Sequence, residues 1–106
     1  MSKAFRRFEL LLPLRFNDGR AVPPGLIADT LLERRTRFGA VSCETQTIRG
    51  MWQYQGQEFR DDLVRVFVDV TEGPETGVFF REFKERLKSR FEQIDIWMTT
   101  YPIEVL

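Results

Sequence analysis

Residues 61–70 alternate between two kinds of side chain with a period of two, and this segment constrains the fold more than any other. Valine occupies every even position from 64 to 70. The odd positions hold a mixture of apolar and charged side chains, namely Leu63, Arg65, Phe67 and Asp69. Successive side chains of a strand point to opposite faces of a sheet, so a period of two is typical of a strand. The segment therefore predicts a central strand with one face made of valine.

The size and composition of the chain favour a single domain spanning residues 1–106. A chain of 106 residues with 42% hydrophobic content can form one core and is too short to divide into two. Its 16 basic and 16 acidic residues cancel, which removes any bulk electrostatic attraction to nucleic acid or to an anionic membrane. There is no histidine, which excludes imidazole metal ligands and a histidine general base. No cofactor and no metal site are expected.

The first residues do not have the pattern of a signal peptide. Three basic residues precede an apolar run that Glu9 and Pro13 interrupt. No apolar run approaches the roughly 20 residues that a membrane-spanning helix needs. Cys43 is the only cysteine, so no intramolecular disulfide can form and no oxidising compartment is implied. These features predict a cytoplasmic protein with no membrane partner.

The remaining segments predict two helices and three more strands. Helices are expected over residues 23–39 and 74–93, because their apolar residues recur every three or four positions. Strands are expected over residues 8–16, 41–54 and 94–106, because their apolar residues alternate with polar ones.

The segment 41–54 contains a change of pattern. Its apolar residues move from odd to even positions, with Gly50 near the change, which predicts a bulge there. A two-residue turn at Gly56 and Gln57 would then place Tyr54 opposite Phe59. Cys43 falls on the side expected to face the helices, which predicts a small core residue and not a nucleophile.

The order strand, helix, strand, strand, helix, strand is that of the ferredoxin-like βαββαβ arrangement, an α+β fold. In this arrangement a four-stranded antiparallel sheet carries both helices on one face, and the first and third strands are central. The helix-covered face is expected to hold Leu10, Leu12, Leu14, Val64, Val66, Val68 and Ile96. The resemblance is to a fold pattern, which carries no function with it.

The opposite face of this sheet is expected to be apolar as well. The large side chains predicted to lie on it are Leu11, Leu63, Phe67, Trp97 and Tyr101. Monomeric proteins rarely expose such a contiguous patch, and the commonest cover is a second copy of the chain. The sequence therefore predicts a homodimer, with hairpin residues Trp52, Tyr54 and Phe59 contacting the partner. This layout resembles the dimeric α+β barrel, whose members include small cofactor-free oxygenases and proteins with no known activity.

These expectations favour a small homodimeric binding or interaction module that uses the free sheet face. The alternative is a cofactor-independent enzyme whose pocket holds a flat anionic or aromatic small molecule, with an arginine binding a carboxylate. The residues expected to form the ligand or dimer face are Leu11, Arg15, Arg65, Phe67, Trp97 and Tyr101. In the simpler interpretation, Arg15 pairs with Asp95 and the aromatic residues are dimer core.

Nucleic acid is the least favoured partner. A basic helical surface would be formed by Arg34, Arg35, Arg37, Arg81, Lys84, Lys88 and Arg90. Acidic residues interleave with them, which is typical of solvent-exposed helices. The adjacent Asp61 and Asp62 do not predict a metal site, because neighbouring residues of a strand point to opposite faces.

Overall fold

The structure is a computed structural model that describes residues 3–44 and 46–106, so Met1, Ser2 and Thr45 of the predicted domain lie outside the described residues. It contains two helices and an antiparallel sheet, which confirms the predicted α+β, ferredoxin-like fold. The sheet has five strands and not the predicted four, because the strand expected over residues 41–54 is divided into two. The elements in chain order are β1 (Lys3–Pro13), α1 (Pro24–Phe38), β2 (Ser42–Cys43), β3 (Ile48–Tyr54), β4 (Gln57–Thr71), α2 (Pro74–Arg90) and β5 (Met98–Val105).

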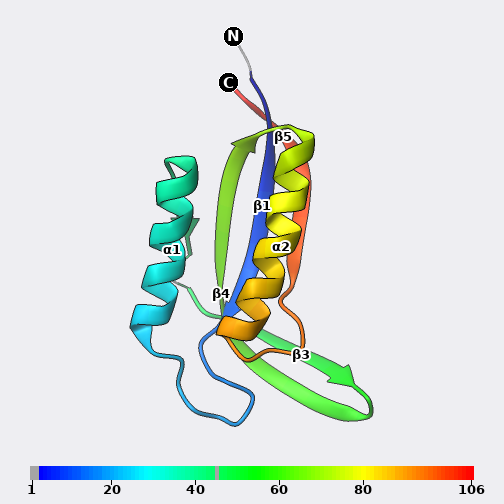
Figure 1. The fold of residues 1–106 in the computed structure, drawn as a ribbon. Coiled ribbons are helices and arrows are strands. Elements are labelled where there is room, and N and C mark those ends of the chain that lie inside the picture. The colour runs from blue at the N-terminus through cyan, green and yellow to red at the C-terminus, as the bar shows by residue number, and fades with distance from the viewer. Residues whose placement is uncertain (1–2, 45) are drawn as a thin grey trace.

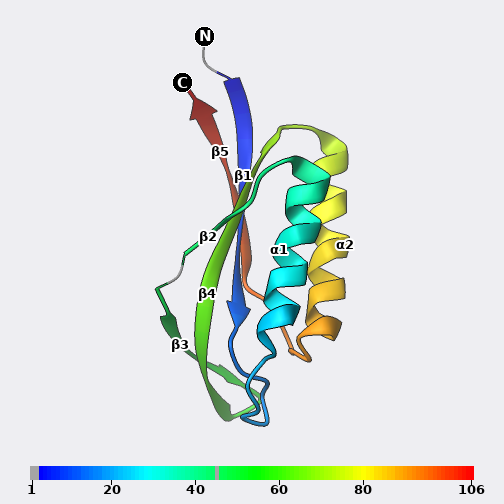
Figure 2. The same cartoon turned by 90° about the vertical axis from the view of Figure 1, so that its left-hand side faces the viewer.

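The sheet follows the order β2-β4-β1-β5, and β3 pairs with residues 57–63 at the start of β4. Both helices cover one face of this sheet, and the other face carries none of the described helices (Figures 1 and 2). We call these the inner and outer faces. The prediction that the first long strand and the valine strand are central is confirmed. Neither helix of the described chain is long and apolar enough to cross a membrane.

The alternation in β4 and β1 explains the core. Antiparallel register places Phe8 opposite Val68 and Leu10 opposite Val66, so apolar residues of both strands share the inner face. The buried apolar residues are Phe8, Leu10, Leu12, Val22, Val64, Val66, Val68, Val70, Phe80, Phe83, Leu87, Phe91 and Ile96. The predicted inner face is confirmed, except that Leu14 is only partly buried.

Strands β3 and β4 form a hairpin that extends beyond the ends of the helices (Figure 1). We call β3 together with residues 57–63 of β4 the hairpin arm. The turn is formed by Gln55 and Gly56, which have φ values of 51° and 79°. Two successive positive φ values are typical of a type I′ turn, which suits the twist of a hairpin.

The predicted turn is one residue too late, and the predicted aromatic pair is therefore wrong. Tyr54 lies opposite Gln57, and Trp52 lies opposite Phe59. The rings of Trp52 and Phe59 stack with their centroids 4.4 Å apart. Gln55 adopts a left-handed conformation that non-glycine residues rarely take, which the sequence alone did not reveal.

The predicted bulge at Gly50 is also wrong. Regular pairing places Gly50 opposite Asp61, and the interruption lies between β2 and β3, where Thr45 is outside the described residues. A Cβ on Gly50 would approach Leu63 Cδ1 to 3.1 Å, so glycine permits close packing of Leu63 across the strand. Cys43 does pair with Val66 of the inner face, but β2 is only two residues long and Cys43 is exposed. Its predicted burial is wrong.

Candidate functional site

The outer face holds a groove of about 740 Å³ between the hairpin arm and the segment that joins α2 to β5. Its lining residues are Leu11, Pro13, Gly50, Met51, Trp52, Tyr54, Asp61, Leu63, Gln93, Ile94, Asp95, Ile96 and Trp97. The backbone N–H of Leu11 donates to the carbonyl of Trp97 at 3.1 Å, which fixes Trp97 beside β1. The groove therefore unites parts of the chain that are far apart in sequence.

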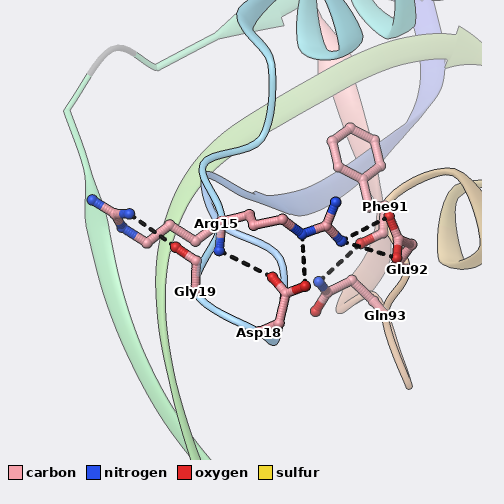
Figure 3. Close-up of polar contacts among 7 residues, drawn as sticks. Arg15, Asp18, Gly19, Phe91, Glu92 and Gln93 are labelled. Atoms are coloured by element: carbon pink, nitrogen blue, oxygen red, sulfur yellow. Dashed lines mark hydrogen bonds and ion pairs between the residues drawn. The ribbon is translucent and has the colours of Figure 1, made fainter.

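The loop after β1 anchors the wall of the groove that contains Gln93. Arg20 Nε donates to Asp18 Oδ2 at 2.6 Å, and Arg20 Nη2 lies 3.3 Å from Glu92 Oε1 (Figure 3). The hydrogen bonds from Arg20 lower the pKa of the Asp18 carboxyl. This ion-pair chain joins the loop to the end of α2, where the groove segment begins.

Large apolar side chains are exposed around the groove. The exposed fractions of Met51, Trp97 and Tyr54 are 74%, 67% and 45%. Trp52 is half-buried, and its Nε1 donates to Asp61 Oδ2 at 2.7 Å. The indole of Trp52 is thus held between Phe59 and Asp61 on the arm.

Two carboxylates line the groove, and only one of them has a cation among the described residues. Asp95 lies 3.1 Å from Lys84 Nζ and also accepts from the backbone N–H of Ile96. Asp61 forms no ion pair with any residue that the structure describes. Its neighbour Asp62 lies on the other face of the strand, 3.7 Å from Arg49 Nε.

The other end of the outer face is charged. Arg7 donates twice to Asp69, at 2.6 and 2.9 Å, and its guanidinium lies 4.4 Å from the centroid of the Phe67 ring. The hydrogen bond with Asp69 raises the pKa of Arg7 above its ordinary range. Arg65 lies over the same ring at 5.3 Å. Phe67 is therefore in contact with two guanidinium groups, a favourable cation–π arrangement.

Acidic side chains complete this charged end. Arg65 lies 2.8 Å from Glu44 and 3.7 Å from Glu9. The hydroxyl of Tyr101 donates to Glu9 Oε1 at 2.5 Å, and this hydrogen bond is the main cause of the raised pKa of Tyr101. We call Arg7, Glu9, Glu44, Arg65, Asp69 and Tyr101 the outer-face network.

The outer-face network divides the predicted apolar face into two parts. Leu11 and Trp97 line the groove, whereas Arg65, Phe67 and Tyr101 belong to or contact the network. The predicted face did not include Arg7, although it continues the odd-numbered series of Glu9 and Leu11. That continuation is the sequence signal that could have identified Arg7.

Arg15 joins neither part. Its Nη1 donates to the carbonyl of Gly19 at 3.1 Å (Figure 3), and it lines an adjoining hollow of about 370 Å³ that shares Gly50, Met51 and Asp61 with the groove. Its predicted pairing with Asp95 is wrong, because Asp95 pairs with Lys84. The arginine-walled pocket for an anion is therefore not assembled at the groove.

The helices do not present a continuous basic surface. Arg34 is 4% exposed, and its guanidinium lies 3.7 Å from the centroid of the Phe83 ring. Burial lowers the pKa of Arg34 to about 10, and its Nε and Nη1 have no hydrogen-bond partner among the described residues. Arg90 pairs with Glu33, and Lys88 pairs with Glu85. These contacts neutralise much of the predicted basic patch.

Neither a reactive thiol nor a metal cluster is found in the described residues. Although Cys43 as a whole is exposed, partial desolvation of its thiol and the nearby Glu44 carboxylate raise the pKa of Cys43, which disfavours its nucleophilic thiolate form. No three His, Cys, Asp or Glu side chains within residues 3–44 and 46–106 are placed to hold a metal ion.

Solved structures of other proteins have a fold similar to that of this chain. No protein-family model matches the chain, and no curated protein sequence matches it. A phage SAM lyase in complex with S-methyl-5′-thioadenosine has a TM-score of 0.69 at 15% identity, covering 95% of this chain and 90% of that chain. A divalent cation tolerance protein (Cut A1) from Thermus thermophilus has a TM-score of 0.58 at 16% identity, covering 93% and 84%. Phage SAM lyase in its apo state has a TM-score of 0.56 at 18% identity, covering 98% and 90%. At these identities the likeness is one of fold.

Proposed function

We propose that the protein is a self-associating binding module whose copies meet on the groove side of the sheet. The observation that carries this proposal is the cluster of exposed apolar side chains around the groove, with Trp97 and Tyr54 exposed to 67% and 45% on its side of the sheet. Single exposed apolar residues are ordinary, whereas a contiguous apolar patch is typical of a surface that another molecule covers.

A second copy of the chain is the partner that we propose. Most soluble oligomers consist of identical chains, and the twofold dimer is the commonest. The hairpin arm extends beyond the helices, so two copies could exchange arms across a twofold axis. Each arm would then cover the open side of the groove in the other copy, leaving an enclosed site for a small ligand.

Sedimentation of the purified chain over a range of concentrations tests self-association. We expect a species of at least twice 12.6 kDa that persists on dilution into the low micromolar range. A single species of 12.6 kDa at every soluble concentration would contradict the proposal.

Catalysis on a small molecule held in the same groove, without a cofactor, is a second candidate. The groove volume of about 740 Å³ is in the range typical of small-molecule sites. The comparison with phage SAM lyase covers nearly the whole chain and names an enzyme in complex with S-methyl-5′-thioadenosine. Asp61 is the carboxylate in the groove without a basic partner among the described residues, so it is the candidate general base.

Incubation with S-adenosylmethionine tests this candidate. We expect S-methyl-5′-thioadenosine to form faster than in buffer, and we expect Asp61→Asn to remove most of the increase, by about 10²-fold or more. Equal rates with and without the protein would exclude this substrate.

A further inference from the structure

The ionisable carboxylates of the groove give it a charge preference. Asp61 and Asp95 line it, and no lysine or arginine of the described chain does. Asp95 is neutralised by Lys84 at 3.1 Å. Asp61 accepts one hydrogen bond from the indole N–H of Trp52, which satisfies part of the carboxylate but does not cancel its charge. Three arginines line the adjoining hollow beside Asp61, but Arg15, Arg49 and Arg60 contact Gly19, Asp62 and Glu58 instead. A carboxylate in largely apolar surroundings is more stable when a cation lies beside it.

Aromatic side chains from two parts of the chain line the same groove as Asp61. Trp52 and Tyr54 come from the hairpin arm, and Trp97 comes from the segment that precedes β5. An aromatic ring, tryptophan above all, attracts a cation over its face, and it also stacks on planar rings. Trp97 is 67% exposed on the single chain and lies at the edge of the groove, so its indole can face a ligand on the groove side as well as the second copy.

We propose that the groove binds a planar organic cation. Its positive charge lies against Asp61, and its ring packs between the aromatic side chains of the arm and Trp97. This inference deepens the proposed binding function and rests on it, since it names the ligand class of the groove. The proposed ligand has the opposite charge to the anion that Arg15 and Arg65 predicted, because neither residue lines the groove.

Three probes of one shape test the charge preference of the folded protein. N-methylquinolinium is a planar cation, quinoline is its neutral counterpart near neutral pH, and quinoline-2-carboxylate is an anion. We expect N-methylquinolinium to bind about tenfold or more tightly than either of the others, measured by tryptophan fluorescence and by calorimetry. Equal or tighter binding of the neutral or anionic probe, or no binding of the cation, would overturn the proposal.

A pair of neighbouring substitutions tests the role of Asp61. Asp61→Asn removes the charge and keeps an oxygen that can accept from Trp52 Nε1, so the arm should fold normally. Asp62→Asn removes an equal charge from the opposite face of the same strand, where Asp62 lies near Arg49. We expect Asp61→Asn to weaken binding of the cation by about tenfold or more and Asp62→Asn to change it less than about twofold. Equal effects of the two substitutions would overturn the assignment to Asp61.

Sedimentation of the same samples separates this inference from self-association. If the chain sediments at 12.6 kDa while the cation binds with dependence on Asp61, self-association fails and the cation site stands. If an assembly forms and the three probes bind equally, the cation site fails and self-association stands.

Discussion

Changing Trp97 to aspartate is expected to convert the assembly into single chains. Trp97 is 67% exposed on one chain and lies at the edge of the groove, where we place the second copy. A carboxylate buried in an apolar contact without a partner costs several kcal/mol, which is comparable to the free energy of a moderately tight dimer. We expect sedimentation at 12.6 kDa for the variant at concentrations where the parent forms an assembly.

Leu32→Asp is the matched control for this substitution. Leu32 is 55% exposed, but it lies on α1, over the inner face of the sheet. We expect this variant to sediment like the parent and to keep the melting temperature of the parent within a few degrees. A Trp97→Asp variant with the mass of the parent assembly would show that the groove side is not the contact.

Phe83→Ala is expected to lower the free energy of unfolding by about 3–5 kcal/mol. Phe83 is fully buried on α2, with its ring near those of Phe79 and Phe80. Truncation would leave a cavity and would also remove the ring that lies 3.7 Å from the guanidinium of Arg34. Because small domains have a total stability of about 5–15 kcal/mol, the variant should approach the limit of stable folding.

Chemical denaturation measures this loss, and Val78→Ala on the same helix is the control. Val78 is 53% exposed, so its truncation should cost less than about 1 kcal/mol. A loss for Phe83→Ala no larger than that of the control would contradict the packing described for α2. An unchanged denaturant slope would show that the loss is one of stability and not of cooperativity.

The fold could be predicted because its strongest signals are local. Valine at every even position from 64 to 70 specifies both a strand and the face that it buries. The short polar segment between the two strands of the hairpin is compatible with more than one turn. Because Gln55 adopts a left-handed conformation, the turn lies at Gln55 and Gly56, one residue before the predicted position. Register then changed the aromatic pair from Tyr54 and Phe59 to Trp52 and Phe59.

The candidate site could be predicted only in part, because it depends on how distant segments approach each other. Alternation assigned Leu11 and Trp97 to the outer face, and both line the groove. The period of two gives the face of Arg65 but not the direction of its long side chain, which reaches Glu44 and the ring of Phe67. Asp61 becomes a candidate only when the fold brings it into the same groove as Trp97.

The length of β4 gives the groove a mechanical property. Within this strand, buried side chains begin at Val64, and β1 pairs with the strand as far as Leu63, so residues 57–61 lie in a two-stranded ribbon with β3 that the helices do not cover. Two-stranded ribbons are more strongly twisted than wide sheets, and fewer neighbouring strands hold them in one shape. Bending the ribbon would change the width between its aromatic residues and Trp97 while the valine core stays in place. The same scaffold could thus accommodate ring systems of different thickness at little cost in stability.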